Sequence, residues 1–390
     1  MQTLRLLVIA TISFLTLVDL FATQALLPAL AQSYGVKPAV IGPAVNACTL
    51  GMALAGVAVA WFNHKINRRL GVSLCLLLLA VPTALLAFMP DLAAFAALRI
   101  VQGAFMSAAF SLTIAYLAEN CTAEEAAAAL AAYVAGNVAS NLFGRLLSAA
   151  IASHYGLGSN FGFFALLNVA GACLAYAALR RTPPMAAATA KSGAAWSHLF
   201  RRPELVSCFA IGFIILFSFI GIFTYVNFVL TGQIGLTMMQ LGLVYLTFIP
   251  SILTTPFAGR VAQRLGARIT IISALGLAAI GLPLLSVPQL VPMLIGLTLV
   301  GAGTFFAQAT ATGYASRAAG ANGGAAGGIY LAFYYAGGLA GSLIVGFAFD
   351  SVGWNAALAV IGVAIAAAVV LATRLTERES FLHKASISNP

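Results

Sequence analysis

The chain has 390 residues, of which 62% are hydrophobic and only 7% are charged, with a formal net charge of +10. Soluble domains carry about 25% charged residues, so this composition excludes a soluble globular protein. Apolar segments long enough to cross a bilayer as helices recur along the whole chain. We place them at residues 6–28, 43–62, 70–89, 92–117, 126–152, 157–180, 205–229, 238–259, 269–287, 290–315, 322–349 and 354–374. The sequence therefore predicts an all-α integral membrane protein with twelve transmembrane helices.

The positive charges are distributed asymmetrically among the segments that join these helices. With an even number of spans, nearly all Lys and Arg residues outside the spans fall on the side of Arg5, whereas Lys37 falls on the opposite side. Loops rich in Lys and Arg stay in the cytoplasm. The charge balance therefore predicts a multi-pass membrane protein with both termini cytoplasmic, and it gives no reason to expect a nucleic-acid partner.

The first predicted span contains a carboxylate, Asp19, near its middle, whereas the other acidic residues lie at helix ends or in loops. A charge at this depth costs roughly 2.5–3.5 kcal/mol on insertion scales, and such residues usually face a cavity, carry a proton or pair with a cation. Ser13, Thr16 and Thr23 share the helical face of Asp19. We interpret Asp19 as a site for protons or a cationic solute; the alternative is a buried ion pair that holds helices together.

Arg99 on the fourth span and Arg145 on the fifth are the cations placed well inside predicted spans. At about 1.5 Å of rise per residue, both lie in the same leaflet as Asp19, so depth permits contact between Asp19 and Arg99. We predict proton coupling at Asp19, with Arg99 and Gln102 tuning its proton affinity. Two alternatives remain open: Arg99 is a structural clamp on helix-end carbonyls, and Arg145 extends to the membrane interface.

The fifth span also carries polar residues at four-residue steps, which places them on one slowly drifting face. These residues are Tyr133, Asn137, Asn141 and Arg145. We expect Asn137, Asn141 and Arg145 to line a substrate cavity. Gly136 belongs to a second face of small residues, which favours close helix packing in lipid.

The C-terminal half lacks charge inside its predicted spans and is rich in aromatic residues there. Of these we predict that Tyr225, Tyr330 and Tyr334 bind substrate, together with Gln308 from a polar stripe on the tenth span. Concave apolar sites with a few polar groups suit lipophilic or amphipathic solutes. The alternative for each ring is core packing or contact with lipid.

The two halves of the chain resemble each other at an offset near 200 residues, as parallel six-helix repeats do in known transporters. Residues 133–142 echo 334–343, and residues 65–69 after the second span echo 264–268 after the eighth. Both matches put the same kind of segment at the same place in each half.

A polar, proline-bearing stretch between the sixth and seventh spans marks the boundary between the halves. We therefore predict an N-terminal six-helix bundle over residues 1–181 and a C-terminal six-helix bundle over 204–390. A cytoplasmic linker over 182–203 joins them.

Three short motifs carry a resemblance to a known family. The fourth span contains Arg-x-x-Gln-Gly at residues 99–103, and basic loops follow the second and eighth spans at 60–69 and 259–268. The chain resembles the major facilitator superfamily in these motifs and in its two halves, specifically the twelve-helix drug/proton antiporter branch. The resemblance implies gating roles for basic and glycine residues of the two loops, namely Lys65, Arg68, Arg69, Gly259, Arg264, Gly266 and Arg268. His64 and Gln263 stand where the family has an acid.

Motifs of nucleotide-driven or hydrolytic chemistry do not occur in the sequence. It contains no Gly-rich phosphate loop ending in Lys-Ser or Lys-Thr, no zinc-ligand spacing and no Ser-His-Asp candidate. We therefore expect neither an enzyme nor a bound cofactor or metal, and we expect the proton gradient to be the energy source.

These features together predict a proton-coupled secondary transporter that exports small amphipathic or lipophilic compounds by alternating access. The alternative is a transporter of an anionic metabolite or sugar-like solute, with Arg99 and Arg145 binding the substrate. The expected partners are the small-molecule substrate, protons and the lipid bilayer, and the expected oligomeric state is a monomer.

Overall fold

The computed structural model describes residues 2–62, 66–120, 123–179 and 198–376, and it is helical without a β-strand in these ranges. The first half comprises α1 (Gln2–Gln24), α2 (Leu27–Tyr34), α3 (Pro38–Asn46), α4 (Cys48–Phe62), α5 (Arg68–Leu86), α6 (Leu92–Asn120) and α7 (Ala123–Ala178). The second half comprises α9 (Pro203–Gly232), α10 (Met238–Val244), η2 (Tyr245–Phe248), α11 (Ile249–Thr254), η3 (Thr255–Phe257), α12 (Ala258–Leu265), α13 (Ala267–Leu285), α14 (Leu290–Ala318), η4 (Gly320–Asn322), α15 (Gly323–Ser351) and α16 (Trp354–Ala372).

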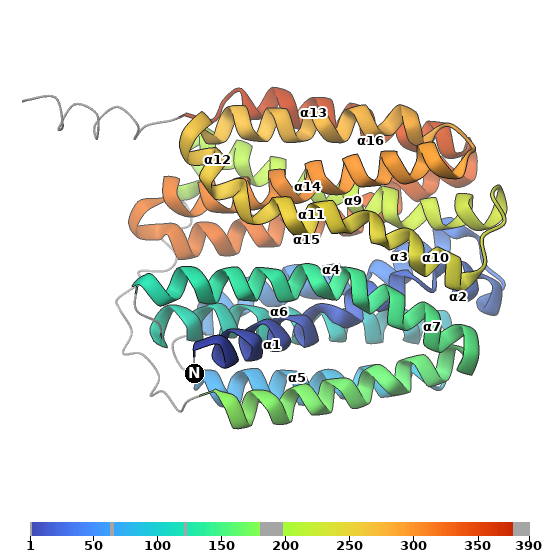
Figure 1. The fold of residues 1–390 in the computed structure, drawn as a ribbon, viewed down its shortest axis with the longest axis horizontal. Helices are drawn as coiled ribbons and strands as arrows, with labels where there is room; N and C mark the ends of the chain where they lie inside the picture. The colour runs from blue at the N-terminus through green and yellow to red at the C-terminus, as the bar shows by residue number, and fades with distance from the viewer. Residues whose placement is uncertain (1, 63–65, 121–122, 180–197, 377–390) are drawn as a thin grey trace, which may run out of the picture.

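Eleven helical segments of the described chain are long and apolar enough to cross a membrane. One of them, Ala132–Ala178, has 47 residues. At about 1.5 Å per residue that segment is more than twice as long as the ~30 Å hydrocarbon core is thick. Gly156 interrupts it with φ 85° and ψ 171°, so α7 forms two arms that run in opposite directions (Figure 1). With α7 counted as two crossings, the all-α, twelve-span fold is confirmed.

Two crossings are not continuous α-helices. The second crossing is built from α3 and α4, which meet at Ala47 shortly after Pro43. The eighth passes from α10 through η2, α11 and η3 to α12, with Pro250 and Pro256 near the starts of α11 and η3. Proline lacks the backbone N–H that a regular helix needs. Such breaks are tolerated at membrane depth where protein covers the backbone.

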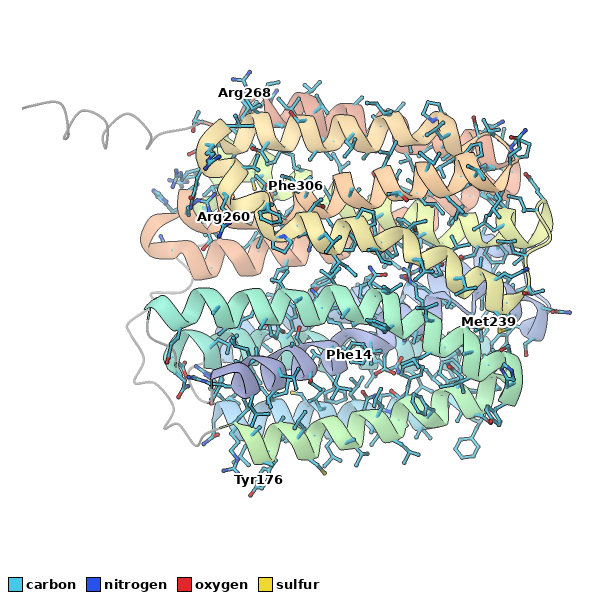
Figure 2. The ribbon with its side chains drawn as sticks, viewed as in Figure 1. Phe14, Tyr176, Met239, Arg260, Arg268 and Phe306 are labelled. Atoms are coloured by element: carbon cyan, nitrogen blue, oxygen red, sulfur yellow. The ribbon has the colours of Figure 1, made fainter. Side chains whose placement is uncertain are left out.

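Helices α1–α7 form one bundle and α9–α16 form the other, and the two bundles lie side by side (Figure 1). Both begin at the same end of the molecule, where α1 and α9 start. We call this end the linker side, and we call the opposite end, which holds α2 and Gly156, the distal side. Arg260 and Arg268 lie at the linker side, whereas Met239 lies toward the distal side (Figure 2).

Most of the predicted linker lies outside the described residues, which omit 180–197. Helix α9 begins at Pro203, one residue before the predicted start of the second bundle. The domain limits 1–181 and 204–390 therefore stay a prediction.

The sequence repeat corresponds to one helix contact that is made in both bundles. Gly136 of α7 packs against the backbone of Ala10 in α1, and Gly337 of α15 packs against the backbone of Phe213 in α9. A Cβ atom on either glycine would overlap with that main chain. Small residues permit this close approach of helices in lipid, so the predicted packing role of Gly136 agrees with its contacts.

Polar contacts join the two bundles in the distal half of the molecule. They run from Asn46 Nδ2 to Thr224 Oγ1 (3.0 Å), from Asn227 Nδ2 to the Gln24 carbonyl (3.2 Å) and from Ala39 N to Asp350 Oδ2 (3.1 Å). Helices α3 and α4 also pack along α15, and α10 packs along α7. The distal side is therefore closed in this conformation.

Candidate functional site

Asp19 is buried in the first bundle, with 3% of its surface exposed. Its Oδ2 atom accepts a hydrogen bond from Asn168 Nδ2 at 2.7 Å. None of the ion pairs within 4.0 Å among the described residues includes Asp19. The carboxylate is therefore held by a neutral amide and not by a cation.

A closed circuit of hydrogen bonds starts and ends at Asp19. Asn168 Nδ2 also approaches Thr83 Oγ1 at 3.3 Å, and the same hydroxyl accepts from Gln102 Nε2 at 2.7 Å. Gln102 Oε1 accepts from Arg99 Nη1 at 2.7 Å, and Arg99 Nη1 donates to the Asp19 carbonyl at 3.2 Å. The circuit joins α1, α5, α6 and the second arm of α7 (all within the N-terminal bundle).

Arg99 also fixes the junction between α3 and α4. Its Nε donates to the Val45 carbonyl at 2.9 Å, and its Nη2 donates to Cys48 Sγ at 3.1 Å. Carbonyls at the end of a helix have no partner within that helix, so Arg99 satisfies one of them. The geometry matches the clamp alternative, and Arg99 meets Asp19 at the backbone rather than at the carboxylate.

Arg145 lies on the first arm of α7 and is 0% exposed, so its side chain does not extend to the membrane interface. Its Nη2 donates to Gln24 Oε1. Four aromatic rings surround the guanidinium, with Cζ-to-centroid distances of 4.1 Å to Tyr245, 5.3 Å to Phe248, 5.5 Å to Phe21 and 5.6 Å to Phe223. These rings come from α1, α9 and η2, so Arg145 lies where the two bundles meet.

The partner of Arg145 connects it to the distal contacts between the bundles. Gln24 Nε2 donates to Asn46 Oδ1 at 2.7 Å, and Asn46 in turn donates to Thr224. On the other side of the guanidinium, Tyr245 donates its hydroxyl to Asn227 Oδ1 at 2.6 Å. Arg145 therefore belongs to the polar network that closes the distal side.

The remaining predicted substrate residues do not all gather at Arg145. Asn141 is buried one turn away from it, whereas Asn137 and Gln308 are half-buried. Tyr330 and Tyr334 stack on each other in α15, with ring centroids 6.2 Å apart. The hydroxyl of Tyr225 donates to the Ser342 carbonyl of α15 and lies beside Gly42 of α3, where the two bundles meet. Whether these residues bind substrate stays a prediction.

The two copies of the loop motif are bonded differently. Lys65 lies outside the described residues. Arg68 forms a buried ion pair with Glu119 at the end of α6. Its Nη2 donates to Glu119 Oε1 at 2.7 Å, and its Nε donates to the same oxygen at 3.0 Å. The guanidinium of Arg69 lies 4.1 Å from the ring centroid of Tyr176. In the second copy, Gly266 has a φ of 85°, while three residues are exposed: Gly259, Arg264 and Arg268.

Sequence reasoning missed Thr83 and Asn168, which complete the circuit around Asp19. Glu119, the partner of Arg68, was missed as well. The available signal for the first two was a polar side chain inside an apolar span. The signal for Glu119 was an acid at the end of the fourth predicted span, near the height of the basic loop.

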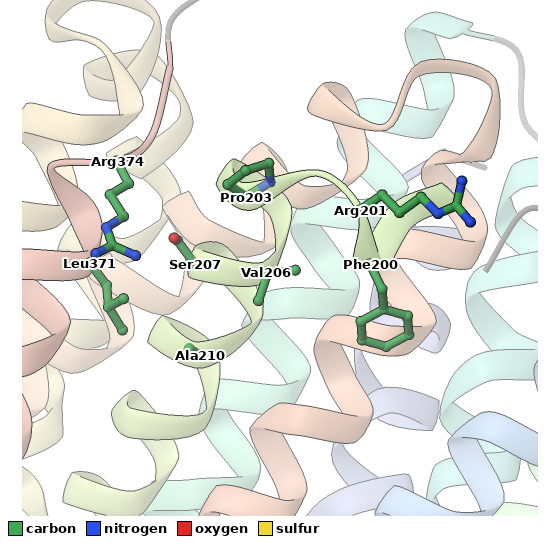
Figure 3. A pocket seen from close by; sticks show the side chains of 8 residues that line it. All are labelled: Phe200, Arg201, Pro203, Val206, Ser207, Ala210, Leu371 and Arg374. Atoms are coloured by element: carbon green, nitrogen blue, oxygen red, sulfur yellow. The ribbon is translucent and has the colours of Figure 1, made fainter. Parts of the chain in front are cut away.

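Two hollows on the C-terminal half are lined by neither Asp19 nor Arg145. One, of about 300 Å³, is lined by the start of α9 and the end of α16, with Arg201, Ser207 and Arg374 on its walls (Figure 3). The other, of about 280 Å³, lies among α11 to α14 beside Phe306. None of the predicted substrate residues lines either hollow.

Comparison with known families gives a match over nearly the whole chain. A family model described as the Major Facilitator Superfamily matches residues 9–249 and 230–389. The uncharacterised MFS-type transporter YybF of Bacillus subtilis is 24% identical over 83% of this chain and 81% of its own length. The inner membrane transport protein YnfM of Escherichia coli is 23% identical over 92% of this chain and 87% of its own.

Solved structures of low sequence identity share the fold. The nucleoside transporter NupG superposes with a TM-score of 0.73 at 13% identity, covering 96% of this chain and 99% of the other. The human organic anion transporter MFSD10 superposes with a TM-score of 0.72 at 18% identity, covering 94% and 99%. A bacterial homologue of the lysosomal transporter Spinster, in an inward-facing conformation, gives 0.72 at 14% identity, covering 96% and 94%.

Proposed function

The chain belongs to the Major Facilitator Superfamily, and on that premise we propose that it is a proton-coupled secondary transporter that exports small amphipathic compounds. Its membrane is the bacterial inner membrane, with both termini cytoplasmic, and it alternately exposes one central site to each side. The observation that carries the proton-coupling part of the proposal is the surroundings of Asp19.

The partner of Asp19 suits both protonation states of a carboxyl group. An ionised carboxylate accepts hydrogen bonds only, and it accepts one from Asn168 Nδ2 here. The other end of the same amide, Oδ1, is buried without a partner. After rotation of the amide, that oxygen can accept a hydrogen bond from a protonated Asp19. One asparagine therefore stabilises the carboxyl group with or without its proton.

The circuit around Asp19 offers a route from the proton to the movement of the bundles. It runs through Gln102 to Arg99, which holds the α3–α4 junction through Val45 and Cys48. Helices α3 and α4 pack on α15 of the other bundle. A change at the Asp19 carboxyl group can thus alter the contact between the halves through the four hydrogen-bonded residues of the circuit.

The amphipathic character of the proposed solute is supported by the composition of the second bundle. Phe219, Phe223, Phe248 and Phe305 form one packed cluster there, with centroid distances from 4.6 to 5.8 Å. Apolar walls with a few polar groups are typical of sites for amphipathic molecules. Two transporters that share the fold are named for nucleosides and for organic anions, so the fold does not fix the class of solute.

The experiment uses everted membrane vesicles energised with a proton gradient and a panel of cationic, neutral and anionic amphipathic fluorophores. The wild type should move at least one of them and release protons as it does so. Asp19→Asn should abolish the coupled movement, whereas Asp91→Asn, which alters an exposed acid that caps α6, should not. Transport by Asp19→Asn at the wild-type rate and with the same pH dependence would contradict the proposal.

A further inference from the structure

One face of α7 carries buried polar atoms that no described residue satisfies. Asn141 and Arg145 are both 0% exposed and lie four residues apart, on the same side of the helix. Both side-chain atoms of Asn141, Nδ2 and Oδ1, lack a hydrogen-bond partner, and so do Nε and Nη1 of Arg145. Buried polar atoms are rarely left unpaired in a folded protein, so each unpaired group needs an explanation.

Arg145 also lacks a counter-ion. The ion pairs of the described residues do not include it, and its protein acceptor is the neutral amide of Gln24. The rings around it compensate part of the charge, because aromatic faces attract a cation. Rings that stack on a planar guanidinium leave the N–H groups at its edges available to an acceptor. The aromatic residues therefore do not replace an anion.

The position of this site suits a transported solute. Phe21 comes from the first bundle and Tyr245 from the second, and Arg145 contacts both. A molecule held by Arg145 between these rings would touch the two halves that move against each other. Transporter sites formed at the interface of two repeats have this property.

We propose that Arg145 and Asn141 bind the carboxylate of a small organic monoanion whose apolar body packs against the surrounding aromatic rings. A guanidinium binds a carboxylate by charge-assisted hydrogen bonds, and Asn141 Nδ2 supplies a further donor. One negative charge is expected because Arg99, the other cation deep in the described spans, is already bonded to Val45, Gln102 and Cys48. This inference rests on the proposed transport function and names its solute class.

The experiment measures binding to the purified full-length protein in detergent with radiolabelled 3-phenylpropionate as the probe. The matched competitors are 3-phenylpropanamide, which is neutral, and 3-phenylpropylamine, which is cationic. The wild type should bind the probe saturably. Both competitors should displace it at least about tenfold more weakly than unlabelled 3-phenylpropionate does, because they lack the negative charge that pairs with Arg145. The absence of saturable binding up to about 10 mM would overturn the proposal.

Variants test the two residues directly. Arg145→Gln should lose at least about tenfold in affinity for the probe, and Arg145→Lys, which keeps the charge, should recover part of it. Asn141→Leu should weaken binding by a smaller factor. Arg260→Gln is the control, since Arg260 is an exposed arginine near the ring of Phe257, 5.9 Å away. Wild-type affinity in a folded Arg145→Gln, judged by size-exclusion chromatography, would show that Arg145 serves only to close the distal side.

A last variant separates this inference from the proton-coupling proposal. Asp19→Asn should keep saturable binding of 3-phenylpropionate while it loses proton-coupled movement. If Asp19→Asn keeps its coupling but Arg145→Gln loses the probe, the proton site is wrong and the anion site stands. If Asp19→Asn loses its coupling but Arg145→Gln keeps the probe, the anion site is wrong and the proton site stands.

Discussion

The side-chain amide of Asn168 faces Asp19 with a donor, at 2.7 Å from Oδ2, while its acceptor atom has no partner. This relationship makes Asn168 a positioning residue for the proton proposed at Asp19. Asn168 can bond the carboxyl group in either protonation state, but the bond to the ionised carboxylate is charge-assisted and therefore the stronger of the two, so Asn168 favours the ionised form. Its removal should therefore change the pH at which the transporter works.

Asn168→Leu tests this dependence. The ionised carboxylate loses its hydrogen bond in a buried setting, so protonation becomes easier and half-maximal transport should shift to higher pH. The measurement is the pH profile of coupled transport in proteoliposomes. Asn168→Gln, which keeps both amide atoms, should shift the profile less. Identical profiles for all three proteins would mean that Asn168 has only a packing role.

The ion pair between Arg68 and Glu119 should stabilise the first bundle. Their side chains are 4% and 14% exposed, and breaking a buried pair costs about 3 kcal/mol because it leaves a buried charge unpaired. Arg68→Gln should lower the free energy of unfolding in mixed micelles by about that amount. An exposed arginine in the second copy of the loop provides the control, since Arg264→Gln should change stability by less than about 0.5 kcal/mol. Equal losses in the two variants would argue against the pair.

The close crossing of α15 and α9 should tolerate no side chain at Gly337. An added Cβ there would overlap with the backbone of Phe213, so Gly337→Ala should reduce the yield of folded protein and its melting temperature. Gly327, on the same helix, has nothing within 4 Å of the position of a Cβ. Gly327→Ala should be neutral or stabilise the helix by about 0.5–1 kcal/mol. A thermal melt of both variants decides between these expectations.

The distal closure depends on a contact between Gly42 in α3 and Tyr225 in α9. A Cβ at Gly42 would collide with the Tyr225 hydroxyl, so Gly42→Ala should push the bundles apart on the distal side. Tyr225→Phe removes that oxygen and should restore part of the closure in the double variant. Distances between spin labels across the distal side measure the closed fraction. Strictly additive effects of the two substitutions would rule out the contact as the cause.

The span count and the pairing of the halves follow from the sequence, because apolar length and helical periodicity are local properties. The second arm of α7 was predicted as a separate crossing that begins after Gly156, and the twin motifs around Gly136 and Gly337 were recognised as a repeat. The expected depths of Asp19 and Arg99 also permitted contact between them, and Arg99 does meet the Asp19 carbonyl. What depth leaves open is rotation about the helix axis, which decides whether a side chain meets a carboxylate or a carbonyl.

Which residues contact the buried charged groups is a property of the tertiary structure. Arg99 contacts the backbone of Asp19, Asn168 from a distant span holds the carboxylate, and Arg145 is enclosed by rings from both bundles. These contacts join residues up to 149 positions apart, as between Asp19 and Asn168. They depend on how tilted helices cross, and crossing is set by close packing at sites such as Gly136 and Gly337 rather than by the residues that meet. Composition and spacing along the chain thus identify which residues are costly to bury, and the packing of the helices sets what each of them contacts.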